Sequence, residues 1–149
     1  CRRVLFLSQY ARRTITGITR GVNKYHIIRA TLDSLCYQTN DVLKAMKADS
    51  GIDLTSLKVD GGASANNYLM QTQSDILNLT VKRPKCVDTT AMGAAYLAGL
   101  AVGYWTDKEE AVKNWEIDKT FTPDIPDEKR EEMISGWDRA VKCSYGWAR

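Results

Sequence analysis

The stretch LKVDGGASANNYLMQ, residues 57–71, decides the predicted fold. It opens with Leu57 and Val59 at alternate positions, which is the pattern of a short strand over residues 56–60. Two glycines follow the strand, and apolar residues then recur at helical spacing over residues 64–77. A hairpin would need a second alternating strand after the glycines, and a helical pattern stands there instead. The stretch therefore predicts a strand, a glycine turn and a helix.

Helices and strands are predicted on both sides of this unit. Upstream, one long helix covers residues 23–50 and ends at Ser50 and Gly51. Downstream, a strand covers residues 79–82 and is stopped by Arg83 and Pro84, because proline cannot donate to a sheet ladder. The remaining predicted elements are a helix over 91–102 capped by Thr89 or Thr90, a short helix over 107–115, a linker over 121–126 and a terminal helix over 127–147. Strands that alternate with helices favour an α/β layer architecture.

Composition and charge exclude several classes of protein. The chain has 149 residues, which suits one domain, and its 44% hydrophobic and 26% charged residues are ordinary for a globular protein. A net charge of +3 is too weak to indicate nucleic acid binding. The longest weakly polar run, residues 91–104, is shorter than the roughly 20 residues of a membrane span. We expect a cytoplasmic protein, and the start at Cys1 rather than Met suggests a fragment.

Cysteine and histidine do not form a metal-binding pattern. The four cysteines are Cys1, Cys36, Cys86 and Cys143, with no C-x-x-C pair, and His26 is the single histidine. We expect free, buried thiols rather than disulfides, because a chain of this size does not need cross-links. His26, near a predicted helix start, is interpreted as a surface or capping residue. The four tryptophans, Trp105, Trp115, Trp137 and Trp147, are predicted to anchor the core.

The glycine turn offers the best candidate binding residues. Gly61 and Gly62 have no Cβ, so a flat ligand could lie against bare peptide. With a helix starting near Ser64, Asn66 would fall in the first turn, where its amide could donate to and accept from a nucleobase or ribose, and the helix N-terminus would suit phosphate. The alternative is a plain tight turn, and neither G-x-x-x-x-G-K-[ST] nor G-x-G-x-x-G is present. Asp60, at the strand end, is a weaker candidate for a general base or metal ligand.

Two segments resemble a known family. They are residues 57–71, quoted above, and TTAMGAAYLAGLAVGYW, residues 89–105. Both closely resemble the glycerol kinases of the FGGY carbohydrate kinase family. The resemblance begins at about residue 10, and residues 1–9 match poorly, so we expect residues 10–149 to be a partial C-terminal FGGY kinase domain. It implies an actin-like ATPase (ribonuclease H-like) fold, in which two related domains close on ATP.

The resemblance also implies roles for the glycine motif. In the family's D-G-G-x-x-x-N motif a glycine and the asparagine bind the nucleotide, which carries over to Gly62 and Asn66, with Gly61 beside them. The catalytic aspartate, the Mg²⁺ carboxylates and the glycerol contacts of the family lie upstream, so no catalytic or metal residue is assigned here. The implied whole enzyme is a homo-oligomer that uses ATP and Mg²⁺ to phosphorylate glycerol, and the chain alone is expected to be inactive. A non-catalytic nucleotide-binding module and another polyol or sugar kinase are the alternatives.

One predicted helix carries a stripe of small residues. Ala91, Ala95, Gly99 and Gly103 follow each other at steps of four, so another backbone could approach closely. The resemblance matches this helix with the family's second connecting helix, where packed helices slide as the cleft closes.

The N-terminal segment departs from the family. Glycerol kinases usually read W-D-x-Y-A-R-G-T, whereas residues 7–14 read LSQYARRT, with Ser8 for the aspartate and Arg13 for the glycine. If that glycine needs a positive φ, Arg13 costs about 1 kcal/mol or more. A truncated or misread N-terminus explains the departure more simply than adaptation.

Overall fold

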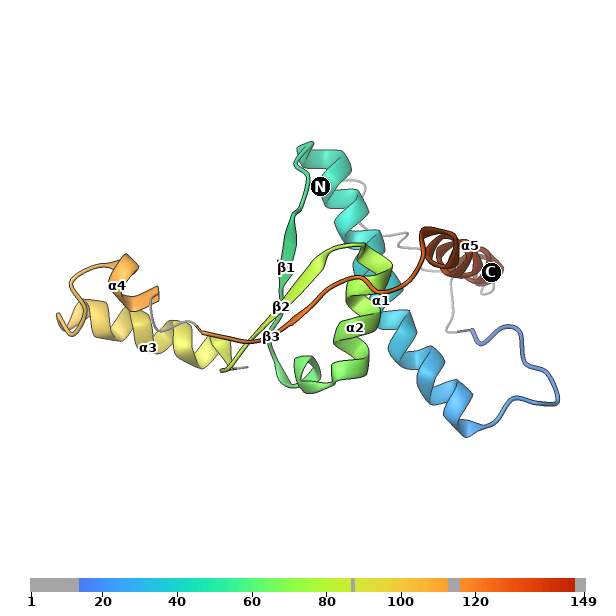
Figure 1. The fold of residues 1–149 in the computed structure, drawn as a ribbon, viewed down its shortest axis with the longest axis horizontal. Coiled ribbons are helices and arrows are strands. Elements are labelled where there is room, and N and C mark those ends of the chain that lie inside the picture. Colours follow the sequence, from blue (N-terminus) through green and yellow to red (C-terminus); the bar gives the residue numbers. More distant parts are fainter. Residues whose placement is uncertain (1–13, 87, 113–115, 147–149) are drawn as a thin grey trace.

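A computed structural model describes residues 14–86, 88–112 and 116–146. Figure 1 shows a central three-stranded sheet, two packed helices beside it, an arm of two helices at one end and a last helix at the other. In chain order the elements are α1 (Lys24–Ser50), β1 (Ser56–Lys58), the 3₁₀ turn η1 (Gly62–Ala65), α2 (Asn67–Leu77), β2 (Thr80–Pro84), α3 (Thr89–Ala101), α4 (Lys108–Val112), β3 (Ile117–Phe121) and α5 (Asp127–Cys143). The predicted order of strand, glycine turn and helix is confirmed.

The sheet is built around β2. β1 pairs with β2 in parallel, and β3 pairs with β2 on its other side in antiparallel orientation. Leu57, Val81 and Phe121 are register partners across the three strands. Because cross-strand partners project from the same face, these three side chains form one apolar row, and Ile76 of α2 belongs to the same core cluster. The row fixes α2 over the sheet as the crossover between two parallel strands.

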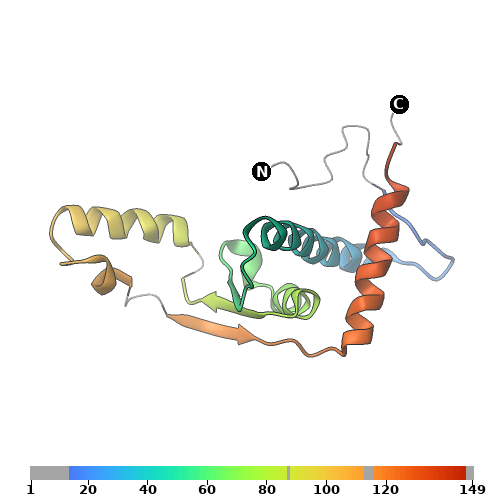
Figure 2. The same cartoon turned by 90° about the horizontal axis from the view of Figure 1, so that it is seen from above.

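The helices form layers on one side of the sheet. α1 packs along α2 and also contacts α5, and Figure 2 shows α5 running across the end of the α1–α2 layer. Cys36 of α1 is fully buried, and its thiol donates to the carbonyl of Leu69 in α2 at 3.6 Å. Trp137 holds α5 on α1, because its Nε1 donates to Asp41 at 2.8 Å and its ring stacks on Tyr37. The predicted role of Trp137 as an anchor is therefore confirmed.

The ends of α1 agree with the sequence prediction. Asn23 is the N-cap, its side chain accepts from the backbone of Tyr25 and His26, and the Nδ1 atom of His26 accepts from the Asn23 N–H in return. This reciprocal pair is a capping box, so the capping interpretation of His26 is confirmed. Gly51, with φ 69°, closes the helix in the left-handed conformation that favours glycine. Within the described residues no helix is both long and apolar enough to span a bilayer.

The strands differ from the sequence prediction in two places. β2 does not stop before Arg83 but continues through Pro84. Pairing with β1 ends at Lys82, and the register with β3 shifts at Arg83 and Pro84, so the missing N–H of the proline breaks no regular ladder. β3 was not predicted at all. Only Phe121 of its five residues is buried and the other four are exposed, so the sequence shows no alternation of apolar and polar residues there.

The α3–α4 arm also differs from expectation. Asp88, not a threonine, is the N-cap of α3, and its carboxylate accepts from the Ala91 N–H at 3.1 Å. α3 ends at Ala101, so Gly103 lies beyond the helix with φ 75°. A Cβ at Gly99 would lie 2.2 Å from the Trp105 ring, so within the arm this ring, rather than a second backbone, covers the glycine. Trp115 and Trp147 lie outside the described residues.

The thiols are only partly as predicted. Cys36 is buried, and burial raises the pKa of its thiol to about 12. Cys86 and Cys143 are free but exposed, which contradicts the expected burial. Both lie beyond the layered core, Cys86 just after β2 and Cys143 at the end of α5. Cys1 lies outside the described residues.

Replacing Ile76 by alanine tests the packing of α2 on the sheet. Ile76 is 1% exposed, and loss of a buried isoleucine costs about 2–5 kcal/mol through lost burial and the cavity that remains. We expect that decrease in the free energy of unfolding for Ile76→Ala, measured by urea titration with circular dichroism. Ile18→Ala is the matched control, since Ile18 is 63% exposed, and it should change stability by less than about 0.5 kcal/mol. Equal losses in both variants would contradict the packing.

The thiols of Cys36, Cys86 and Cys143 should differ in their reactivity toward a thiol reagent. The thiolate is the reactive form, and both burial and the raised pKa of Cys36 suppress it near neutral pH. At pH 8 we expect a chromogenic disulfide reagent to label Cys86 and Cys143 rapidly in the folded chain and Cys36 only after unfolding. Peptide mapping by mass spectrometry identifies the labelled sites. Labelling of native Cys36 as fast as Cys86 would show that α1 does not cover it.

Candidate nucleotide-binding site

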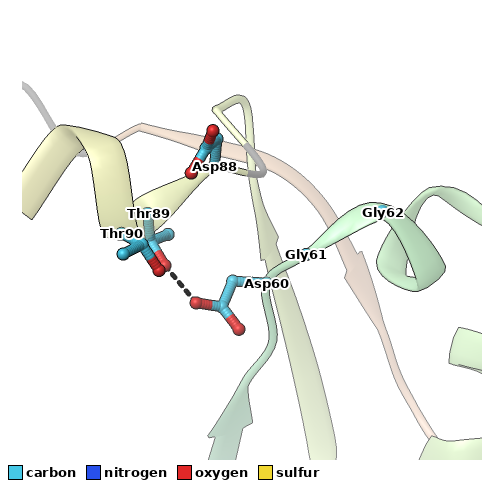
Figure 3. A pocket seen from close by; sticks show the side chains of 6 residues that line it. All are labelled: Asp60, Gly61, Gly62, Asp88, Thr89 and Thr90. Atoms are coloured by element: carbon cyan, nitrogen blue, oxygen red, sulfur yellow. Dashed lines mark hydrogen bonds between the residues drawn. The ribbon is translucent and has the colours of Figure 1, made fainter.

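A pocket of about 350 Å³ lies where β1 and β2 lead out of the sheet. Its lining residues, drawn in Figure 3, are Asp60, Gly61, Gly62, Asp88, Thr89 and Thr90. The first three follow β1 and the last three surround the start of α3, which follows β2. Because β1 and β2 are parallel, their carboxyl ends meet at one edge of the sheet, where ligands of α/β proteins bind.

The glycine turn presents bare peptide to this pocket. Gly61 has φ 79° and ψ 167°, a conformation that is essentially restricted to glycine. Gly62 begins η1, and a Cβ built on either glycine meets no atom within 4 Å. The space beside both residues is therefore open. The structure places both predicted glycines in the pocket lining.

Ser64 fixes the shape of the turn from inside. It is 1% exposed, and its hydroxyl donates to the Gly61 carbonyl at 2.7 Å. The Ser64 backbone N–H donates to the same carbonyl at 3.0 Å, so one oxygen receives two hydrogen bonds. Sequence reasoning used Ser64 only as a helix start. In the sequence, the local signal for this bond is a serine three residues after Gly61.

Asn66 occupies a different position from the one predicted. Because η1 takes residues Gly62–Ala65, α2 starts later than expected, and Asn66 is its N-cap rather than part of its first turn. Its side-chain oxygen accepts from the Leu69 N–H at 3.2 Å. Asn66 lies beyond η1 and is not among the residues that line the pocket. Capping engages the oxygen, which leaves the side-chain NH₂ as the group with which Asn66 can meet a ligand.

A direct bond joins the two halves of the pocket. The Thr89 hydroxyl donates to the Asp60 carboxylate, as the dashed line in Figure 3 shows. Asp60 is thus engaged with the start of α3, and the weaker hypothesis that it serves as a general base or metal ligand stays a prediction. In the part of the chain that the structure describes, no group of three His, Cys, Asp or Glu side chains gathers to hold a metal ion.

The chemistry of the lining suits hydroxyl groups better than bare phosphate. Two carboxylates, Asp60 and Asp88, face the pocket together with the hydroxyls of Thr89 and Thr90. Carboxylates accept hydrogen bonds from sugar hydroxyls and repel an uncompensated anion. The arrangement can bind and orient a ligand that carries hydroxyl groups, and the contact between Thr89 and Asp60 is the hydroxyl–carboxylate pair within the lining.

Sequence reasoning missed the contribution of the α3 start. Asp88, Thr89 and Thr90 line the pocket, whereas the two threonines were considered only as caps. The signal was available in the predicted topology, because residues that follow two neighbouring parallel strands meet at the same sheet edge. A glycine turn at that edge makes this pocket the candidate ligand site of an α/β domain.

Comparison with known proteins identifies the family. The C-terminal domain of the FGGY family of carbohydrate kinases matches residues 2–102, about two thirds of the chain. The chain therefore belongs to the FGGY family of carbohydrate kinases.

Similar sequences are named glycerol kinases. The chain is 65% identical to a glycerol kinase of Agathobacter rectalis over 144 residues, which is 97% of this chain and 29% of that protein. It is 62% identical to glycerol kinase 1 of Clostridium tetani over 140 residues, 94% of this chain and 28% of that protein. The chain thus spans less than a third of the length of these relatives.

Solved structures confirm the predicted fold. The Plasmodium falciparum glycerol kinase with ADP superimposes with a TM-score of 0.79 at 36% identity, covering 91% of this chain and 27% of that one. A ligand-bound xylulose kinase of Lactobacillus acidophilus gives a TM-score of 0.67 at 18% identity, covering 91% and 26%. The chain is a partial C-terminal domain of the actin-like ATPase fold, as expected.

Alanine at the two adjacent glycines should have different effects on stability. Gly61 has a φ that costs other residues about 1–3 kcal/mol, so Gly61→Ala should lower the free energy of unfolding by that amount. Gly62 has no positive φ and open space around it, so Gly62→Ala should change stability by less than about 0.5 kcal/mol. Urea titrations of both variants measure the difference, and a Gly62→Ala loss as large as that of Gly61→Ala would refute the turn geometry.

Proposed function

We propose that this chain is the nucleotide-holding C-terminal part of an ATP-dependent glycerol kinase, which transfers the γ-phosphate of ATP to glycerol and forms glycerol 3-phosphate. The observation that carries the proposal is the 65% identity to the Agathobacter rectalis glycerol kinase over nearly the whole chain. The glycine turn at the carboxyl edge of the parallel strands supports it. The Plasmodium falciparum glycerol kinase, which was solved with ADP, has the same fold over this region.

The residues of the pocket fit a nucleoside. Gly61 and Gly62 offer bare peptide against which a ribose or base can lie, because a Cβ at either position would project into open space. Asn66 would donate from its side-chain NH₂ while its oxygen keeps α2 capped. The hydrogen bond from Thr89 to Asp60 links the two halves of the lining.

Chemistry requires groups that these residues do not supply. ATP, bound with Mg²⁺, supplies the phosphoryl group for transfer. Phosphoryl transfer depends almost wholly on positioning and charge neutralisation, and a catalytic base and metal carboxylates are expected from the remainder of a complete kinase. The chain alone should therefore hold nucleotide weakly and show no turnover. A homo-oligomeric, cytoplasmic enzyme completes the proposal.

A hybrid kinase tests the function directly. It is the Agathobacter rectalis glycerol kinase in which this chain replaces the matching segment of 144 residues. We expect the hybrid to phosphorylate glycerol in the presence of ATP and Mg²⁺, measured by a coupled assay for ADP release. Asn66→Ala should raise KM for ATP about tenfold, the effect of one lost hydrogen bond worth about 1.4 kcal/mol, and leave KM for glycerol unchanged.

Two controls make the result decisive. Asn78→Ala removes an exposed asparagine at the far end of α2 and should leave KM for ATP unchanged. The chain by itself, assayed in parallel, should release no ADP. An inactive hybrid with a normal far-ultraviolet spectrum would favour a non-catalytic nucleotide-binding module, and a hybrid that prefers xylulose or gluconate over glycerol would favour another sugar kinase.

A further inference from the structure

Arg83 connects the sheet to the segment that carries Asn66. It lies on β2, and its side chain is only 12% exposed. One nitrogen of the guanidinium, Nη1, donates to three oxygens near the turn. They are the carbonyls of Ser64 at 3.0 Å and Ala65 at 3.3 Å and the side-chain oxygen of Asn67 at 2.9 Å. A strand residue thus contacts the chain on both sides of Asn66.

The opposite side of the guanidinium is fixed by β3. Arg83 donates from Nε at 2.8 Å to one carboxylate oxygen of Asp118, and its Nη2 forms an ion pair with the same oxygen at 2.6 Å. Its Cζ atom also lies 5.5 Å from the centre of the Phe121 ring. A planar guanidinium held in this way has little rotational freedom, so its third nitrogen points in a set direction. β3 therefore sets the direction of the bonds to the turn.

These bonds meet a specific need of the backbone. η1 is a 3₁₀ turn of four residues that ends at Ala65. The carbonyl groups of its last residues therefore receive no hydrogen bonds from a continuing helix. Between η1 and α2 the backbone of Asn66 is extended, with φ −79° and ψ 107°. Asn66 is thus a joint between two helical segments. Arg83 binds both segments and holds the joint at one angle.

We propose that Arg83 is a positioning residue for the nucleotide, acting through Asn66. It orients the Asn66 side chain and the glycine turn toward the ligand without contacting the ligand itself. Asp118 assists by orienting Arg83. This inference rests on the proposed function, because it assumes that Asn66 meets the nucleotide.

The hybrid kinase tests this role with Arg83→Lys, which keeps the positive charge and loses the planar guanidinium that holds Asp118 on one side while Nη1 reaches both segments. We expect KM for ATP to rise about tenfold, with KM for glycerol within about twofold and the melting temperature close to that of the parent hybrid. Arg139→Lys is the matched control, because Arg139 is exposed on α5 and belongs to neither the sheet nor the glycine turn; it should leave all three values unchanged. Asp118→Asn should raise KM for ATP less than Arg83→Lys and serves as the second variant if Arg83→Lys does not fold.

A double variant separates positioning from general stability. If Arg83 acts through Asn66, Arg83→Lys should add less than about twofold to KM for ATP in the Asn66→Ala background. If the double variant raises KM for ATP by the product of the two single-variant factors, the inference is overturned. An unchanged KM for ATP in both folded single variants, Arg83→Lys and Asp118→Asn, would also overturn it. A rise in both KM values with a large fall in melting temperature would show a purely structural role. If Asn66→Ala itself has no effect, the assignment of the nucleotide site fails, which is distinct from a failure confined to Arg83.

Discussion

The structure depends on the apolar row that Leu57, Val81 and Phe121 form across the sheet. The row brings together three strands that are well separated in the chain, and Ile76 of α2 packs in the same core cluster, in which Val81 and Phe121 are buried and Leu57 is half-buried. Burial of apolar surface is the main favourable term in folding, so this contact sets the place of the crossover helix. α1 then packs on α2, and α5 packs across both α1 and α2. Each outer layer thus depends on the layer beneath it.

The same contact places the candidate site. With α2 fixed over parallel β1 and β2, the residues that follow both strands must meet at one edge of the sheet. Gly61 reverses the chain there, and Thr89 reaches across to Asp60. On the sheet side of the turn, Arg83 extends from β2 and forms hydrogen bonds with the segment around Asn66. The site is therefore held from two directions by the scaffold that the core establishes.

The α3–α4 arm differs in character from this core. α3 has no buried residue although its sequence is strongly apolar, and Leu97 and Val102 are 70% and 81% exposed. In Figure 1 the arm extends away from α1 and α2. The chain spans less than a third of its glycerol kinase relatives, and a helix with this composition is ordinarily buried. The candidate pocket lies at the junction of the arm and the core, since Thr89 opens α3.

The sequence by itself determined the order of strand, glycine turn and helix, both ends of α1 and the glycines of the site. These features follow from local periodicity, from caps and from the φ that Gly61 needs, all of which act within a few residues. Only the tertiary structure decided that residues 117–121 form a strand and that Thr89 meets Asp60. The same holds for the bonds of Arg83 to Ser64 and Asn67. The physical reason is that these interactions join residues that strand pairing and the burial of α2 bring close together. The sequence does not reveal them, because an exposed, polar strand shows no hydrophobic periodicity and a single arginine does not indicate its partner.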